Sequence, residues 1–396
     1  MPETSFDCVA NPRAGTPGIV VLPAGGFRRA RAEIIGWPGY APTPLRDLPA
    51  GGFGVACVRL KDEAERFGLG SFKALGGAYA VQQLLAAELA RRGVANAASA
   101  ADLEAGRYAD AVRRITVTCA TDGNHGRAVA WGAQRFGAAC VIFVHETVSQ
   151  GRIDAIAQYG AAIRRVPGTY DDAVREAARV AEAEGWFVVS DTSWPGYTAV
   201  PVDIMQGYRL MADEAAEAWQ GAPPTHVFIQ GGVGGVAAAV SVQMRAKFHP
   251  SPCVVVVEPD QAACLLASHR AGTLTAVGGK LDTLMAGLAC GEPSLLAWQE
   301  LERGAGAFMA IPDSAAVDAM RALAGLGIVS GESGAAGYAG LALAAADPAA
   351  RAVLGLDAAS RVLLFSTEGA TDPALYDRLV MQARDAPANL AAAKHT

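Results

Sequence analysis

The amino-acid sequence predicts an α/β fold of two domains, each built on a mainly parallel, twisted sheet flanked by helices. Two observations carry this prediction. Short apolar runs of strand length alternate with Ala-rich stretches of helical length, which is the pattern of parallel strands joined by helical crossovers. The chain also has 396 residues, more than one hydrophobic core usually organises.

The predicted strands are apolar runs at residues 114–118, 140–144, 162–166, 187–190, 227–230, 253–258 and 361–365. Residues 254–257 are four consecutive valines, as expected of a strand that is buried on both faces. The segment 93–110 is rich in Ala, Gly and Asp without periodicity and is predicted to be an inserted surface loop. Ligands of open parallel sheets bind beyond the carboxyl ends of strands, so residues that follow the strands are the candidates for a binding site.

The composition favours a protein whose partner is a small molecule. Hydrophobic residues make up 52% of the chain and the formal net charge is −6. No run of Lys and Arg supplies a phosphate-neutralising face, so nucleic acid is not an expected partner. No apolar run approaches the ~20 residues of a membrane helix, and acidic Glu3 and Asp7 argue against a secretory signal. We therefore expect a cytoplasmic protein that binds neither nucleic acid nor membrane.

The seven cysteines have neither the spacing of a metal site nor that of a disulfide framework, so no metal is expected. Most lie in apolar strand-like runs, where a buried thiol is the ordinary outcome. Cys264 and Cys290 differ because they flank a loop-rich region. A reducing cytoplasm disfavours a disulfide there, and the sequence leaves their pairing open.

Three motifs contain residue types that carry chemistry. Lys73 lies among small residues in GLGSFKALGGAY (residues 68–79), ahead of a helix-like run; a lysine in a tight, partly dry pocket loses its proton easily and can form a Schiff base with a carbonyl. Residues 120–127 have the sequence ATDGNHGR, and residues 230–235 have the sequence QGGVGG between a strand-like run and an Ala/Val-rich helix. A glycine loop in that position can bind phosphate at the helix N-terminus.

In this order, the lysine, the Asn-bearing loop and the glycine loop resemble the fold type II enzymes that depend on pyridoxal 5′-phosphate (PLP), relatives of the tryptophan synthase β chain and of threonine dehydratase. Threonine dehydratases usually carry a small residue at the position of Asp122. The segment TDGNHGR, followed by Val129, Ala130 and Trp131, looks instead like diaminopropionate ammonia-lyase. Three more segments resemble that subfamily: DTSWPGY at 191–197, MAGLACGEPS at 285–294 and STEGATDP at 366–373.

The resemblance implies how the chain is divided. A large cofactor-binding domain would contain residues 1–72 and 191–396, and a small domain would contain residues 73–190. PLP would lie in the cleft between the two domains. A homodimer is expected from the family, although no segment of the sequence identifies an interface.

The resemblance also assigns residues to the cofactor. Lys73 would hold PLP as a Schiff base, and Asn124 would hydrogen-bond its 3′-oxygen or, alternatively, cap the following helix. Ser366, with Thr367 as the neighbouring candidate, would face the pyridine nitrogen or simply end a strand. A hydroxyl does not keep that nitrogen protonated, which favours β-elimination over transamination. The phosphate would be bound by the glycine loop, formed by Gly231, Gly232, Val233, Gly234 and Gly235.

Asp122 and Asp191 determine the predicted substrate. A carboxyl group beside an anionic cofactor has a raised pKa, which suits a general base. By resemblance, Asp122 would take the α-proton from a D-amino acid and Lys73 from the L-enantiomer, while Asp191 would hold the β-ammonium group of the substrate. The local alternatives are an Asx turn for Asp122 and an N-cap for Asp191.

Other residues in the motifs receive no catalytic role from the sequence. His125 is expected to be a structural loop histidine. Tyr170, Glu332 and Ser333 match family segments near the cleft, but their spacing alone assigns them no function.

The predicted function is therefore PLP-dependent α,β-elimination of D- and L-2,3-diaminopropionate to pyruvate and two molecules of ammonia. A serine or threonine dehydratase of the same fold is the nearest alternative, and Asp122 and Asp191 argue against it because a hydroxyl substrate offers them no cation. A PLP-binding protein without turnover is a second alternative, disfavoured by the intact Lys73 and the two aspartates. A nucleotide-binding oxidoreductase is weaker still, because the chain lacks G-x-G-x-x-G after an early strand with an acidic residue ~20 positions on.

Overall fold

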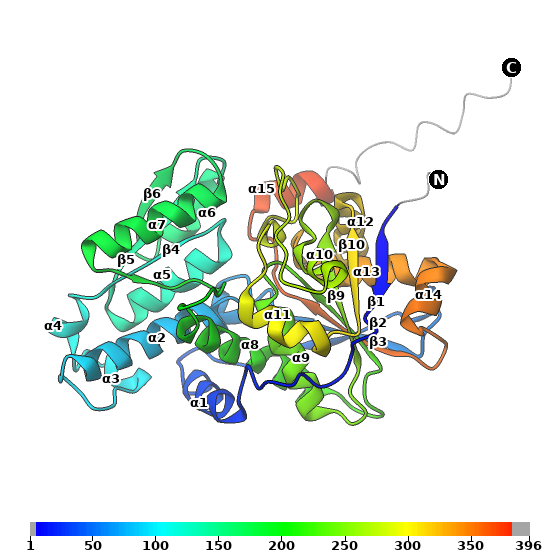
Figure 1. The fold of residues 1–396 in the computed structure, drawn as a ribbon, viewed down its shortest axis with the longest axis horizontal. Helices are drawn as coiled ribbons and strands as arrows, with labels where there is room; N and C mark the ends of the chain where they lie inside the picture. Colours follow the sequence, from blue (N-terminus) through cyan, green and yellow to red (C-terminus); the bar gives the residue numbers. More distant parts are fainter. Residues whose placement is uncertain (1–4, 382–396) are drawn as a thin grey trace, which may run out of the picture.

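The chain folds around two separate sheets (Figure 1). The structure is a computed structural model, and it describes residues 5–381. The larger sheet has the strand order β1-β10-β9-β8-β11-β3-β2. Its inner strands are parallel, while β1 and β2 pair antiparallel with their neighbours at the two edges. Its strands are β1 (Asp7–Ala10), β2 (Leu45–Leu48), β3 (Cys57–Asp62), β8 (His226–Gln230), β9 (Cys253–Pro259), β10 (Ala307–Ile311) and β11 (Arg361–Ser366).

The smaller sheet is wholly parallel and has the order β6-β5-β4-β7. Its strands are β4 (Thr116–Ala120), β5 (Ala139–His145), β6 (Ala162–Val166) and β7 (Phe187–Val188). All of them lie within the predicted small domain, residues 73–190, whose exact boundaries stay a prediction. The two mainly parallel sheets with their helices confirm the predicted fold class.

The helices connect the strands and cover the sheets (Figure 1). They are α1 (Ala24–Ile34), α2 (Ala74–Arg91), α3 (Ala100–Glu104), α4 (Ala109–Val112), α5 (Asn124–Phe136), α6 (Gln150–Ala157), α7 (Tyr170–Glu184), α8 (Ala199–Ala218), α9 (Gly235–Lys247), α10 (Cys264–Ala271), α11 (Leu295–Gly304), α12 (Asp313–Gly325), α13 (Ala336–Ala346), α14 (Pro348–Leu354) and α15 (Pro373–Tyr376). Helix α2 packs against both α5 and α8. It therefore joins the half that contains the smaller sheet to the rest of the molecule.

The sequence predictions missed part of this fold. Strands β1, β2, β3 and β10 were not predicted; β1 and β2 are short edge strands with exposed side chains, and β10 is a short buried run that composition does not distinguish from helix. The prediction of a loop at 93–110 was wrong, because α3 and the start of α4 lie there. A capping box between Ser99 and Asp102 begins α3, and Leu103 is buried, so local hydrogen bonds and burial form a helix too short for periodicity to reveal.

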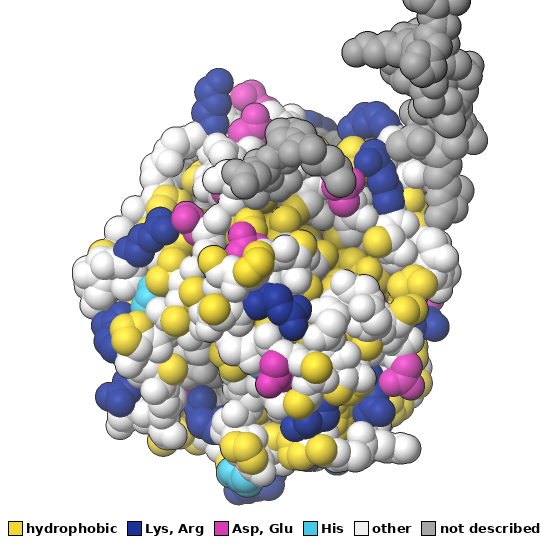
Figure 2. Space-filling view, turned by 90° about the vertical axis from the view of Figure 1, so that its right-hand side faces the viewer, with side chains coloured by type: hydrophobic (Ala, Val, Ile, Leu, Met, Phe, Trp, Pro, Cys, Tyr) yellow, Lys and Arg dark blue, Asp and Glu magenta, His cyan; other side chains and the backbone are white. Residues whose placement is uncertain are grey.

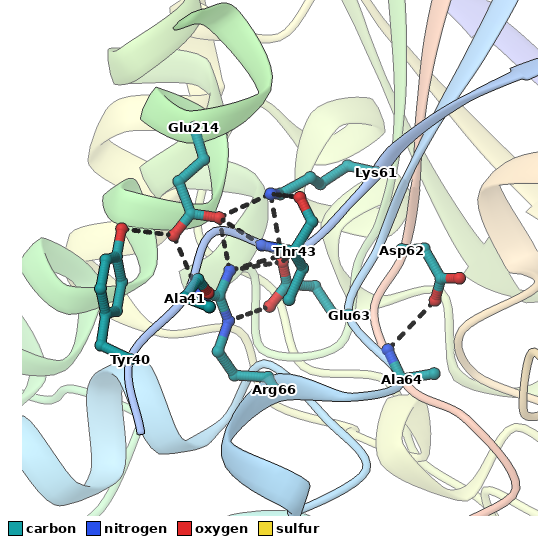
Figure 3. Close-up of polar contacts among 9 residues, drawn as sticks. All are labelled: Tyr40, Ala41, Thr43, Lys61, Asp62, Glu63, Ala64, Arg66 and Glu214. Carbon is teal, nitrogen blue, oxygen red and sulfur yellow. Dashed lines mark hydrogen bonds and ion pairs between the residues drawn. The ribbon is translucent and has the colours of Figure 1, made fainter. Parts of the chain in front are cut away.

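A buried charge network joins α8 to the segment that precedes Lys73 (Figure 3). Arg66 donates hydrogen bonds to Glu63 (Nε to Oε2, 2.8 Å) and to Glu214 of α8 (Nη1 to Oε1, 2.9 Å). Lys61 also pairs with Glu214. Buried charges are tolerated only when paired, and this pairing fixes α8 relative to the chain that leads from β3 to Lys73.

Charged side chains of both signs lie on the side of the surface that Figure 2 shows. Lys and Arg side chains are scattered there among acidic and neutral ones, over the area that the described residues occupy (Figure 2). Among residues 5–381, each helix is too short or too polar to cross a membrane.

Candidate active site

One pocket gathers most of the predicted site residues. It lies beyond the carboxyl ends of strands from both sheets, since Asp122 follows β4, Asp191 follows β7 and the glycine loop follows β8. Lys73, just before α2, and Asn124, at the start of α5, line the same pocket. Segments far apart in sequence thus meet where ligands of parallel sheets bind.

Lys73 and Asp191 form an ion pair inside this pocket. The Lys73 ammonium (Nζ) lies 2.6 Å from Oδ2 of Asp191. Burial acts to lower the pKa of Lys73, but the attraction of Asp191 outweighs it and the pKa is raised. The pKa of Asp191 is lowered because Lys73 and His125 outweigh the effect of its own burial. The expectation that Lys73 loses its proton easily was therefore wrong for this structure, because the sequence did not reveal that Asp191 pairs with it.

The loop that carries Asp191 is held in place by hydrogen bonds on both sides. Tyr197 donates from its hydroxyl to Val188 O (2.9 Å) and accepts from Ser190 N (3.0 Å). Ser193 Oγ lies 2.6 Å from Ser294 Oγ, just before α11. The carboxylate of Asp191 pairs with Lys73 and caps no helix, so the N-cap alternative is not what the structure has.

Asp122 has a partner that the sequence did not reveal. Its Oδ1 lies 2.8 Å from Nε2 of His145, at the end of β5, and Nδ1 of His145 lies 2.9 Å from Oγ1 of the exposed Thr147. Asp122 is thereby connected to the surface. The role of Asp122 as a general base stays a prediction.

His125 lies closer to the chemistry than expected. Its Nε2 lies 2.8 Å from the carbonyl of Val189, and its Nδ1 lies 3.8 Å from Asp191 Oδ2. Burial lowers the pKa of His125, although the attraction of Asp191 opposes this effect. A neutral imidazole that donates to Val189 presents an unprotonated Nδ1 toward Asp191.

Asn124 makes two side-chain contacts in the pocket. Its Nδ2 donates to Glu368, and its Oδ1 accepts from Arg127 Nη2 at 2.8 Å. The cap position of α5 is Gly123, and the side chain of Asn124 makes no capping bond. Its predicted bond to the cofactor stays a prediction, and Glu368 is a neighbour that the sequence did not assign.

The glycine loop is built for a close approach of backbone to ligand. A Cβ on Gly232 would lie 3.2 Å from Gly287 O and 3.4 Å from Cys290 Sγ, and Gly234 has φ +96°, which favours glycine. The amides of Gly232, Gly234 and Gly235 donate no hydrogen bond to the described residues. Gly231 differs, because its amide donates to Val257 O at 2.8 Å. The sheet uses that amide, so Gly231 shapes the turn and the later residues offer N–H groups at the start of α9.

The structure separates the two hydroxyl candidates of the STEGATDP segment. Thr367 lines the pocket. Ser366 ends β11 and is fully buried, with its Oγ 2.8 Å from Oγ of Ser330. Ser366 is not among the residues that line the pocket, and its predicted role stays a prediction.

Tyr170, Glu332 and Ser333 also line the pocket. Burial raises the pKa of Tyr170, with Asp191 and Asp122 adding to the effect. Burial and the neighbouring Glu368 raise the pKa of Glu332 to about 7, although Arg152 of α6 donates to its Oε1 at 2.7 Å. The sequence motifs had indicated these three residues but had assigned them no role.

Some pocket residues could not have been found from local sequence. Tyr208 lies in the middle of α8 in no recognised motif, and Arg152 lies on α6. Cys290 lines the pocket and Cys264 lies behind it, with Sγ 3.6 Å from Gly232 O. Both cysteines are free thiols in the structure. Within the described residues, no three His, Cys, Asp or Glu side chains gather in a way that could hold a metal ion.

These residues fit PLP. The primary amine of Lys73 lies in the pocket. Backbone amides at the N-terminus of α9 have no partner among the described residues and can bind a ligand there. A side chain on Gly232 would be tight against Gly287 and Cys290. An amine binds an aldehyde, and unpartnered amides at a helix start bind a phosphate.

Comparison with known proteins agrees with this fit. The family model of pyridoxal-phosphate dependent enzymes matches residues 37–357. The chain belongs to this family. It is 41% identical over 370 residues to diaminopropionate ammonia-lyase of Escherichia coli (strain K12), which covers 88% of this chain and 90% of that protein. The enzyme of the same description from Salmonella typhimurium is 39% identical over 368 residues, covering 88% of this chain and 90% of that protein.

The fold of the chain also matches that of a solved diaminopropionate ammonia-lyase. The crystal structure of the E. coli diaminopropionate ammonia-lyase in complex with D-serine superposes with a TM-score of 0.88 at 38% identity, covering 97% of this chain and 98% of that one. Within the PLP-dependent family, the chain therefore belongs with the diaminopropionate ammonia-lyases, and the predicted family and fold type II are confirmed.

Proposed function

We propose that this enzyme catalyses the PLP-dependent α,β-elimination of D- and L-2,3-diaminopropionate to pyruvate and two molecules of ammonia. The observation that carries the substrate assignment is the ion pair of Asp191 with Lys73. A carboxylate that binds a primary ammonium group in this pocket has the chemistry needed to bind the β-ammonium group of diaminopropionate. A serine or threonine side chain would offer it only a neutral hydroxyl.

Bound PLP supplies an electron sink conjugated to the substrate Cα, which acidifies the α-proton. Lys73 would attach the cofactor, and the amides of Gly232, Gly234 and Gly235 would bind its phosphate at the start of α9. Asn124 would turn its amide to the ring oxygen. Each of these groups lies on the wall of one pocket, which is what supports the assignment.

We assign the proton transfers to Lys73 and Asp122. Lys73 would take the α-proton of the L-enantiomer, and Asp122 that of the D-enantiomer. Both line the pocket. In the structure, Lys73 contacts Asp191 and Asp122 contacts His145. When the Cβ–N bond breaks, its electron pair leaves with the nitrogen as ammonia, and the released 2-aminoacrylate hydrolyses to pyruvate and a second ammonia.

The serine dehydratase alternative is supported by one specific observation, the D-serine complex of the E. coli relative. Product stoichiometry separates the two activities. Purified enzyme with PLP should release two ammonia for each pyruvate from D- and L-diaminopropionate, at a much higher kcat/KM than it releases one ammonia for each pyruvate from serine or threonine. A preference for serine or threonine would refute the proposed substrate.

We further propose that the enzyme works in the cytoplasm as a homodimer, as its resemblance to the family implies. Analytical ultracentrifugation of the holoenzyme should give twice the mass of the chain. Cell fractionation should recover activity with the cytoplasm. A monomer with full activity would contradict the proposed assembly.

A further inference from the structure

The hydroxyl of Tyr208 has no role in the site described above and no hydrogen-bond partner of ordinary geometry among residues 5–381. Tyr208 lies on α8, is 1% exposed and lines the pocket. Its hydroxyl makes no hydrogen bond of ordinary length and angle with the described residues, and Lys73 is the group close enough to act on it as a hydrogen-bond donor. A buried polar group without a partner is unfavourable, so such a group on a pocket wall indicates a partner that arrives during the reaction.

The packing of α8 on α2 fixes Tyr208 beside Lys73. The Lys73 ammonium lies 5.6 Å from the centre of the Tyr208 ring and 5.3 Å from that of Phe72, and the two rings are 4.6 Å apart. The helices approach closely through two glycines: a Cβ on Gly76 would overlap the Tyr208 ring, and a Cβ on Gly207 would overlap the backbone of α2. The charge network of Figure 3 holds the other end of α8.

Lys73 needs a second partner if the proposed function is right. In the structure, its ammonium is paired with Asp191. During turnover, Asp191 must bind the β-ammonium group of the substrate, while Lys73 is a free amine that accepts the α-proton. The side chain of Lys73 is only 19% exposed, and an ammonium so far removed from water is costly without a partner. The buried hydroxyl beside it is that of Tyr208.

We propose that Tyr208 is a positioning residue for Lys73, with its hydroxyl accepting a hydrogen bond from the Lys73 ammonium while Asp191 binds the substrate; this rests on the proposed function. For the L-enantiomer, the Cα–H bond breaks and an N–H bond forms on Nζ. The electron pair stays on the substrate until it leaves with cleavage of the Cβ–N bond. Tyr208 remains neutral and orients Nζ throughout.

The first test measures Lys73 itself and needs no turnover. In the full chain freed of PLP, trace labelling with acetic anhydride at several pH values reports how much of Lys73 is free amine. The titratable groups that act on Lys73 are Asp191, Tyr208, Cys290 and His125. In an Asp191→Asn background, Tyr208→Phe should raise the labelling rate below the Lys73 pKa by roughly tenfold, because the ammonium loses its acceptor. Labelling unchanged by Tyr208→Phe would overturn the proposal.

The matched control is Tyr79→Phe, which removes a hydroxyl from an equally buried tyrosine on α2 that is not among the residues lining the pocket. It should leave Lys73 labelling unchanged. An equal change from Tyr79→Phe would mean that the effect is one of general packing, and would also overturn the proposal.

The second test uses the holoenzyme with Asp191 intact. Tyr208→Phe should lower kcat for L-diaminopropionate about tenfold with little change in KM, and should affect the D-enantiomer less, because its proton goes to Asp122. Equal losses on both enantiomers would overturn the proposal. If the wild-type enzyme did not act on diaminopropionate, the proposed function would fail, while the labelling experiment would still decide whether Tyr208 holds Lys73.

Discussion

The two proposed bases stand in different surroundings. Lys73 is paired with a full opposite charge, Asp191, and lies beside the rings of Phe72 and Tyr208. Asp122 instead contacts His145, which in turn contacts the exposed Thr147. A proton on Lys73 is thus held within the pocket, whereas a proton on Asp122 has a hydrogen-bonded route to solvent. The Lys73 side of the pocket is therefore suited to keeping a proton, and the Asp122 side is suited to exchanging one with solvent.

The largest expected effect is the loss of Lys73, because both enantiomers depend on its attachment to the cofactor. Lys73→Ala should lower turnover of D- and L-diaminopropionate on the order of 10⁴-fold or more. The wild-type holoenzyme should absorb at roughly 410–420 nm, as lysine Schiff bases of PLP do, and borohydride should attach PLP permanently to Lys73. Peptide mapping that found PLP on another lysine would contradict the assignment.

Replacing Asp122 should lower turnover of the D-enantiomer more than turnover of the L-enantiomer. Asp122→Asn should lower D-diaminopropionate turnover by about 10²–10⁴-fold, the typical cost of a lost general base, and should affect L turnover less. Steady-state kinetics with each pure enantiomer measure this. Equal losses on both would mean that Asp122 supports the whole site, and the two-base account would fail.

Replacing Asp191 should lower the activity on diaminopropionate more than the activity on serine. Asp191→Ala should weaken elimination from diaminopropionate by about 2–5 kcal/mol in activation free energy, the usual cost of removing one partner of a buried charge pair, and should affect residual serine elimination far less. The measurements are kcat/KM for both substrates and Tm. Ser193→Ala, which disturbs the same loop without removing the carboxylate, is the control. Equal losses on both substrates with a lowered Tm would show that Asp191 is structural.

The smallest expected effect concerns the route to solvent. His145→Leu should lower D-diaminopropionate turnover by roughly tenfold, about the cost of losing a hydrogen bond to a charged group, and should leave L turnover nearly unchanged. Thr147→Val tests the outer step of the same route and should have a smaller effect on the same enantiomer. A loss on the L-enantiomer from either change would remove the distinction between the two sides of the pocket.

Local sequence was enough to predict those site residues that belong to motifs. Lys73, Asp122, Asn124, Asp191 and the glycine loop were named from short segments, and the structure places them in one pocket. Each motif follows a strand or opens a helix, and strands of a parallel sheet end at a common edge. The alternation of strands and helices predicted the fold class for a similar reason, since short-range periodicity reports burial.

Contacts between distant segments could not be predicted in this way. The sequence placed Asp191 with the substrate, but only the folded chain showed that it pairs with Lys73, 118 positions away. His145 and Tyr208 belong to no motif. Their roles depend on where the fold places them: His145, at the end of β5, contacts Asp122, and Tyr208, on α8, lines the pocket. The sequence by itself determined the fold class, the family and the motif residues. Tertiary structure decided their partners and the direction in which the pKa of Lys73 is shifted, because electrostatic interactions depend on distances in space that spacing along the chain does not encode.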